Sequence, residues 1–378
     1  NNVPAQVITQ YGVAPDGACV MTAPDGTIYK DYYGTGWQKG LTTLSEIWSG
    51  GVRKKWITTA WTQDDTNLSY PKNPRPYDTS IYDEANNRRR VETIYTSYNL
   101  PDAVALPTEV KEYKANGSDV LRRTTTMYYD GGQPYIDRRV LGLQREVIVY
   151  DENNQPQSRV WYDYDWTTPD AWVATAQPAP QHDPSGDARG RGNLMWVGRW
   201  DVSDFDNSDK LSRSYLKYNR TGSVIKTEDH FGHGKTFTYT DSFSDGVTTR
   251  YTYAYPTTIT DSDGGSSYAQ YNVDTGAATR TESPAPAGQS QGPIQTMTYN
   301  NLGQLERITT VNTGAYMRYY YGSYFIQSYS TVNSVTDDAY TNRVFDGLGR
   351  VRAVASNHPD SDGGYKAQLT IYDSMGRA

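Results

Sequence analysis

One short pattern recurs along the chain and limits what it can fold into. The pattern is an aromatic residue, Asp or Asn, two variable residues, Gly, then a polar and an apolar residue. It occurs as "FDGLGRVRAV" from Phe345, "YNNLGQLERI" from Tyr299 and "YNRTGSVIKT" from Tyr218, and the last eight residues, "IYDSMGRA", begin another copy. Looser copies are "YDENNQPQSRV" from Tyr150, "YKANGSDVLRR" from Tyr113 and "YNVDTGAATR" from Tyr271, the last with one extra residue before its Gly. Some copies lie about 27 or 28 residues apart, so we interpret the chain as an array of degenerate repeats.

The chemistry of the pattern predicts a hairpin turn. An Asp or Asn side chain at the first turn position accepts hydrogen bonds from backbone N–H groups two residues on. Gly three positions later adopts positive φ at little cost, as a type I turn followed by a bulge requires. Asn154 replaces Gly in the copy from Tyr150, and Asn tolerates the same region of φ and ψ. The aromatic residue then ends one strand, and the apolar residue (Val351, Leu305 or Val224) starts the next.

Between the turns, bulky residues alternate with polar ones, as in "RYTYAYP" (250–256) and "SRVWYDYDW" (158–166). The chain has 34 Tyr against 6 Phe, 33 Gly and a mean hydropathy of −0.77. Tyr and Thr suit half-solvated strands, and Gly, Asn and Asp suit turns. We therefore expect an all-β fold, a repetitive antiparallel array of β-hairpins.

The repeated Tyr-Asp-x-x-Gly-Arg pattern in a Tyr-rich and Thr-rich chain resembles the RHS/YD-repeat family. "FDGLGRV" and "IYDSMGRA" match it best, and "YNNLGQL" is close. The resemblance implies a ribbon of hairpins that coils into a spiral shell. In this family such shells enclose a C-terminal toxic or effector domain, or serve in cell-surface contact, as in the related teneurins. It also implies that the aromatic residue and Arg of each turn pack or bond against the neighbouring hairpin.

Breaks in the alternation suggest an organisation in three parts. We expect an N-terminal β-rich repeat region at 1–166, a Pro- and Gly-rich loop or insertion at 167–195, and a repeat array at 196–378. Residues 1–110 have the same alternating strand-and-turn sequence pattern, including two Pro-Asp-Gly turns, but they contain no good copy of the motif. The final copy lacks its outgoing strand, so we expect the array to be truncated at its C-terminal end.

The overall charge and the single cysteine exclude several classes of protein. A formal net charge of −7 and a pI near 5.2 show none of the excess positive charge that is typical of proteins that bind nucleic acid. Cys19 is the only cysteine, so neither an intrachain disulfide nor a multi-cysteine metal site is possible. No run of about 18 apolar residues predicts a membrane span, and the first residues lack the features of a signal peptide.

Three short stretches could carry chemistry, and each is better interpreted as a turn. "HFGH" at 230–233 has a spacing that could place two metal ligands together, but it is flanked by Gly in a turn-and-strand context. "DSDGG", at 261–265 and 360–364, lacks the acidic residue that closes a calcium loop. "DPSG" at 183–186 resembles the Asp-Pro-x-Gly element that ends RHS cores and is linked to self-cleavage, but more repeats follow it.

We therefore predict no catalytic, cofactor-binding or metal-ligating residue, no cofactor, and no enzyme activity. The resemblance leads us to expect a structural segment of a secreted bacterial RHS-repeat protein, part of a shell around a C-terminal toxin or effector. The expected partners are the rest of the same polypeptide, and the expected location is outside the cell or at its surface. The alternative is an adhesion or carbohydrate-binding module whose partners are surface glycans or a surface protein.

Overall fold

The computed structural model of the chain describes residues 10–65, 67–97, 105–129, 132–165, 190–205, 207–219, 221–331, 339–358, 361 and 363–373. These residues form 25 β-strands, one five-residue α-helix and two short 3₁₀ helices. No helix in these ranges is long and apolar enough to cross a membrane. Backbone contacts divide the chain into two units, one of residues 1–170 and 186–215 and one of residues 171–185 and 216–378. The expectation of an all-β, repetitive antiparallel array is confirmed.

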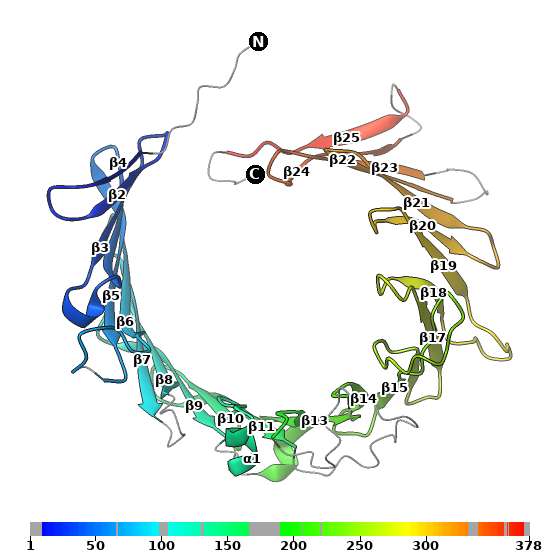
Figure 1. Ribbon diagram of the computed structural model, residues 1–378, viewed down its shortest axis with the longest axis horizontal. Helices are drawn as coiled ribbons and strands as arrows, with labels where there is room; N and C mark the ends of the chain where they lie inside the picture. The colour runs from blue at the N-terminus through cyan, green and yellow to red at the C-terminus, as the bar shows by residue number, and fades with distance from the viewer. Residues whose placement is uncertain are drawn as a thin grey trace. The chain divides into compact units, whose positions relative to one another are not determined.

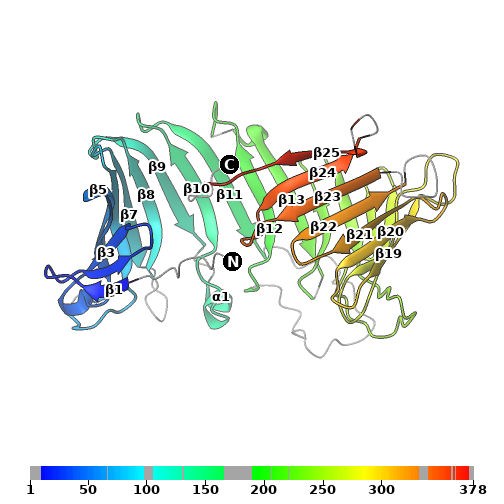
Figure 2. The ribbon, with the colours of Figure 1, turned by 90° about the horizontal axis from the view of Figure 1, so that it is seen from above.

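In the first unit each strand pairs antiparallel with the next one in the sequence. Figure 2 shows β7 to β11 side by side in chain order. The boundary between the units falls within β13. The elements are β1 (Gln10–Val13), β2 (Cys19–Thr22), β3 (Ile28–Tyr33), η1 (Gly36–Gln38), β4 (Thr42–Ser49), β5 (Val52–Thr62), β6 (Arg75–Asp83), β7 (Arg88–Ser97), β8 (Ala105–Tyr113), β9 (Val120–Tyr128), α1 (Gln133–Asp137), β10 (Gln144–Tyr150), β11 (Pro156–Tyr164), β12 (Leu194–Trp200), η2 (Ser208–Lys210) and β13 (Leu211–Tyr218).

The second unit continues the same up-and-down order, and β17 to β24 follow one another around its sheet (Figure 1). Again each strand from β14 onward pairs antiparallel with its successor. Its strands are β14 (Val224–Glu228), β15 (Gly234–Thr238), β16 (Thr258–Asp261), β17 (Ser266–Tyr271), β18 (Ala278–Glu282), β19 (Ile294–Tyr299), β20 (Leu305–Thr310), β21 (Tyr316–Tyr321), β22 (Phe325–Ser330), β23 (Ala339–Phe345), β24 (Val351–Asn357) and β25 (Tyr365–Leu369).

Most strand side chains in both units are half-buried rather than buried. Large apolar side chains are scarce in the sequence, so the sheets have little material for a separate core. The described residues that form the buried apolar set are Ala18, Tyr128, Tyr135, Tyr164, Met195, Leu211, Phe243 and Ile294. Strand pairing, turn geometry and polar contacts of the aromatic side chains therefore contribute to stability beside this small buried set.

The predicted hairpin turn is confirmed where the motif is described. In the copy from Phe345, the Asp346 carboxylate accepts hydrogen bonds from the N–H groups of Leu348 and Arg350, both at 2.9 Å. The N–H of Gly349 donates to the Asp346 carbonyl at 3.0 Å, and Gly349 has φ +78°. The same arrangement, with Gly or Asn at positive φ three residues on, begins at Asp83, Asp151, Asn219, Asp229, Asp261, Asn300 and Asp346.

Three of these turns were not recognised in the sequence as copies of the motif. The turn at Asp83 lies within residues 1–110, where no good copy was expected, and it has Asn86 (φ +66°) in place of Gly. The turns at Asp229 and Asp261 lack the preceding aromatic residue, because Glu228 and Thr260 occupy that position. The turn therefore depends on Asp or Asn and on positive φ, and the aromatic residue has a separate role.

The loop expected at 167–195 lies mostly outside the described residues, and β12 already begins at Leu194. The division of the chain at that loop stays a prediction. The "DPSG" stretch and His182 also lie outside the described residues, as do the Gly and Arg of the final motif copy.

Replacing Gly349 with Val should destabilise the protein, whereas replacing Gly347 in the same turn with Ala should not. A Cβ atom on either glycine would have open space around it to 4 Å, but only Gly349 has positive φ. Left-handed backbone costs an L-residue about 1–2 kcal/mol, and more when the side chain is β-branched. Denaturant unfolding of both variants measures the difference, and equal stabilities would show that the turn does not require positive φ.

Candidate functional site

A row of aromatic hydrogen bonds closes the open ends of strand pairs within each unit. Each of these bonds joins an even-numbered strand to the odd-numbered strand that follows it in the chain. The turn that connects the two strands lies at one end of the pair. The aromatic bond lies at the other end, where the even strand starts and the odd strand ends. There an aromatic side chain near the end of the odd strand donates to a backbone carbonyl near the start of the even strand. We call these contacts aromatic staples; they run from Trp61 to Thr42, Tyr95 to Pro76, Tyr128 to Pro107, Tyr239 to Val224, Tyr271 to Pro256, Tyr299 to Ala278, Tyr321 to Leu305 and Tyr372 to Val351.

The staples have nearly uniform geometry. The donor–acceptor distances are between 2.7 and 3.0 Å, which is normal for hydroxyl and indole donors. Trp61 donates through its indole Nε1 to the Thr42 carbonyl at 2.9 Å. A staple can therefore be made by a different aromatic residue as long as that residue has a donor. Phe345 ends β23 at the corresponding position and has no donor. The staples thus explain why Tyr rather than Phe stands at seven of these positions.

Partial burial favours the protonated form of several staple hydroxyls. Burial raises the pKa of Tyr95, Tyr239, Tyr271 and Tyr321 above the usual value of 10.0. A neutral phenol is a hydrogen-bond donor, whereas a phenolate is not. At neutral pH these side chains are therefore all in the form that can staple adjacent strands.

The Arg of the motif ties a turn to the following staple. The guanidinium of Arg350 lies 4.4 Å from the ring centre of Tyr372, and its Nε donates to Asp346 at 2.7 Å. Tyr372 in turn donates to the carbonyl of Val351, the first residue of β24. In this copy the motif's Arg thus packs on the aromatic residue of the next copy, as expected; for the other copies that expectation stays a prediction.

The stretches with possible metal-ligand spacing are turns. His230 and His233 lie in the turn that begins at Asp229, whose carboxylate accepts from the N–H groups of Phe231 and His233 at 2.9 Å. The first "DSDGG" forms the same turn, with the Gly265 N–H 2.7 Å from the Asp261 carboxylate. The second lies between β24 and β25, and two of its five residues are outside the described ranges. Within those ranges no three His, Cys, Asp or Glu side chains gather in a way that could hold a metal ion.

One buried carboxylate fixes the described backbone on either side of residues 166–189. Asp165 is 3% exposed, and it accepts hydrogen bonds from the N–H groups of Arg191, Gly192 and Asn193 at 3.0, 2.7 and 3.0 Å. Its own N–H donates to the Asn193 carbonyl. Burial raises the pKa of the Asp165 carboxyl, while the three N–H groups and Tyr135 oppose that shift. No local pattern around Asp165 indicates this contact, because the partners lie 26 to 28 residues further along the chain.

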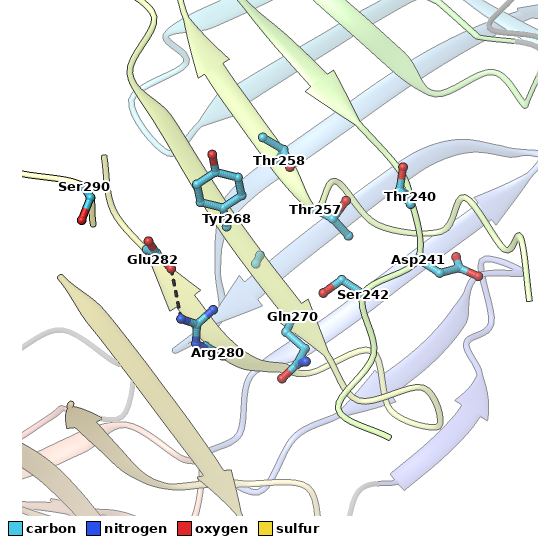
Figure 3. Close-up of a pocket in the computed structure, with 11 residues that line it drawn as sticks. Thr240, Asp241, Ser242, Thr257, Thr258, Tyr268, Gln270, Arg280, Glu282 and Ser290 are labelled. Atoms are coloured by element: carbon cyan, nitrogen blue, oxygen red, sulfur yellow. Dashed lines mark hydrogen bonds and ion pairs between the residues drawn. The ribbon is translucent and has the colours of Figure 1, made fainter. Parts of the chain in front are cut away.

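The second unit has a polar hollow of about 560 Å³, which we call the trough (Figure 3). The loop between β15 and β16, the strands β16, β17 and β18, and the loop after β18 supply its walls. Its lining side chains are mainly hydroxyl, amide and charged groups, from Thr240, Asp241, Ser242, Thr257, Thr258, Tyr268, Ala269, Gln270, Arg280, Glu282 and Ser290. The trough was not expected from the sequence, because its residues look like ordinary alternating strand positions.

Strand register explains how the trough side chains come together. Thr258, Tyr268 and Glu282 are directly paired across β16, β17 and β18, and Gln270 is paired with Arg280 one step along. Paired residues, and residues two apart on one strand, share a face of the sheet. Figure 3 shows the Tyr268 ring between Thr258 and Glu282, with Arg280 bonded to Glu282 at 3.0 Å.

The loop wall of the trough is held by its own contacts. The Asp241 carboxylate, which is largely buried, accepts from the N–H of Thr252 at 3.0 Å and from its hydroxyl at 2.7 Å. Tyr255 stacks on Tyr271 with ring centres 4.7 Å apart. The wall is therefore a fixed part of the second unit.

Comparison with known proteins leaves the family open. No family model and no curated protein matches the chain. Among solved structures, TcdB2–TccC3 without its hypervariable C-terminal region is 11% identical with a TM-score of 0.24, covering 97% of this chain and 23% of that one. The Tc holotoxin pore of Photorhabdus luminescens is 11% identical with a TM-score of 0.25, and the match covers 97% of this chain and 22% of that one. A porin-like protein from Bacteroides uniformis is 11% identical with a TM-score of 0.21, and the match covers 85% of this chain and 92% of that one.

The chain thus spans less than a quarter of the length of the Tc toxin chains that it matches. A TM-score of this size does not establish a common fold.

Proposed function

We propose that this chain is a non-catalytic structural segment of a secreted bacterial RHS-repeat protein. In this proposal its hairpins form part of the wall of a β-shell. The shell encloses or displays a toxin or effector domain at the C-terminal end of the same polypeptide. The main partners of the segment are then further repeats and that enclosed domain.

The observation that carries the proposal is the recurrence of one turn and one staple along the chain. Seven turns share the side-chain and backbone hydrogen bonds described at Asp346, and eight staples bind strands where no turn joins them. A wall built this way needs no thick core, because paired strands are fastened by a turn at one end and by a staple at the other. The motif copies "FDGLGRV" and "IYDSMGRA" supply the link to the RHS/YD-repeat family.

The second candidate is an adhesion or carbohydrate-binding module built from the same repeats. The trough in the second unit favours it, since a polar hollow with an exposed Tyr is unnecessary in a wall that only encloses. The two functions differ in what accompanies the array. A shell requires an enclosed domain, whereas an adhesion module requires a surface anchor or further repeats.

Cryo-electron microscopy of the complete gene product tests the proposal. The shell function predicts residues 1–378 in the wall of a closed β-structure with density for a further domain inside. An open array without an enclosed domain would overturn it in favour of adhesion. Hydrolase activity in the purified chain that one carboxylate substitution abolishes would contradict its non-catalytic part.

A further inference from the structure

We propose that the trough of the second unit binds a neutral saccharide of one or two sugar rings. The proposal does not depend on the shell function, because it concerns only the described side chains of β16 to β18 and of the two adjoining loops. It assigns a binding site to a chain whose sequence indicated none.

The trough offers an aromatic surface beside unpaired polar groups. Tyr268 is 47% exposed, and its hydroxyl makes no hydrogen bond within the described part of the chain. The hydroxyls of Thr258 and Ser242 are likewise unpaired among these residues. A sugar ring has an apolar face that packs on an aromatic ring and hydroxyls that bond around it, so this combination suits a saccharide.

The dimensions of the trough agree with this ligand class. Thr258, Tyr268 and Glu282 span three adjacent strands, which are about 4.8 Å apart, so the row is roughly 10 Å long. That length accommodates a disaccharide lying across the strands. The volume of about 560 Å³ lies in the usual range of small-molecule sites.

The charges favour a neutral ligand. Among the described residues that line the trough, Arg280 is the only cationic one, and it is paired with Glu282 at 3.0 Å. Asp241 adds a second carboxylate, whose hydrogen bonds are taken up by Thr252. An anion would meet two carboxylates and one neutralised Arg, and a cation would have to displace Arg280 from Glu282. A neutral polyhydroxyl ligand meets neither penalty.

Saturation-transfer NMR and calorimetry test the site with cellobiose, maltose, lactose and N,N′-diacetylchitobiose, and with 3′-sialyllactose as an anionic probe. We expect at least one neutral disaccharide to bind with a Kd of about 5 mM or tighter, which is a weak affinity of roughly 3 kcal/mol. We also expect sialyllactose to bind more weakly than lactose. Binding by none of the neutral sugars would overturn the proposal, as would tighter binding of the anionic probe.

Variants place the ligand in the trough. Tyr268→Ala should weaken binding about tenfold, which corresponds to about 1.4 kcal/mol. Glu282→Gln should also weaken it, because it replaces the carboxylate partner that holds Arg280 with a weaker, neutral acceptor of nearly the same shape. Tyr365→Ala is the matched control: Tyr365 is 57% exposed in the same unit but lies on β25. The proposal fails if the folded Tyr268 and Glu282 variants bind as wild type does, or if the Tyr365 variant loses binding equally.

Discussion

A chain with Tyr299, Tyr321 and Tyr372 all replaced by Phe should lose about 3 kcal/mol of unfolding free energy. Each substitution removes one hydroxyl that donates to a backbone carbonyl at 2.8 or 2.9 Å. The net value of such a bond is about 1 kcal/mol, and the carbonyl left behind loses its partner in a partly buried place. The three staples share no residues, so their effects should add approximately.

A second triple variant separates the staples from a general effect of losing tyrosine hydroxyls. Tyr268, Tyr324 and Tyr365 are 47%, 64% and 57% exposed, lie in the same unit, and make no hydroxyl hydrogen bond among the described residues. Their replacement by Phe should change stability by less than about 0.5 kcal/mol per site. Denaturant unfolding of both triple variants gives the comparison. Equal losses would mean that the staples contribute nothing specific.

Replacing Asp165 with Ala should cost about 3–5 kcal/mol in the first unit. The substitution removes the acceptor of three backbone N–H groups at once, in a place where the carboxylate is 3% exposed. A buried donor left without a partner costs about 1–3 kcal/mol. Amide hydrogen exchange should also rise in β11 and β12, which Asp165 joins. Unchanged protection of these two strands would contradict a stabilising role for the contact.

Replacing Asp165 with Asn should be milder and should remove a pH dependence. Burial raises the folded pKa of this carboxyl above its ordinary 3.8. Because the folded pKa of Asp165 is raised, the contribution of this group to the stability of the folded protein is fully present below pH 3.8. That contribution is lost as the pH rises through the pKa of Asp165 in the folded protein. The stability of Asp165→Asn relative to wild type should therefore increase over that interval. Denaturant unfolding at a series of pH values measures this, and a constant difference would show that Asp165 does not titrate there.

The turns could be predicted from the sequence because their chemistry is local. Asp346 and Gly349 are three residues apart, and the side-chain oxygen and positive φ that they supply are visible in the letters alone. The turn at Asp83 was not predicted, because Asn86 stands in for Gly there and Asn is a weaker signal of positive φ.

The staples and the trough could not be predicted, because both depend on strand register. The partner of Tyr299 is a backbone carbonyl 21 residues away, and any residue at position 278 could provide it. The trough needs Thr258, Tyr268 and Glu282 to pair across three strands and a loop to close one side. A shift of one residue in β17 would turn Tyr268 to the other face.

The most direct test of the stapled hairpin array is an experimental structure at a resolution that shows tyrosine hydroxyls. It measures the distances from the hydroxyls of Tyr299, Tyr321 and Tyr372 to the carbonyl oxygens of Ala278, Leu305 and Val351. We expect about 2.8, 2.8 and 2.9 Å, all at the edge where no turn joins the paired strands. Hydroxyls that point into solvent at these three positions, or a strand register that separates them from those carbonyls, would contradict a stapled array.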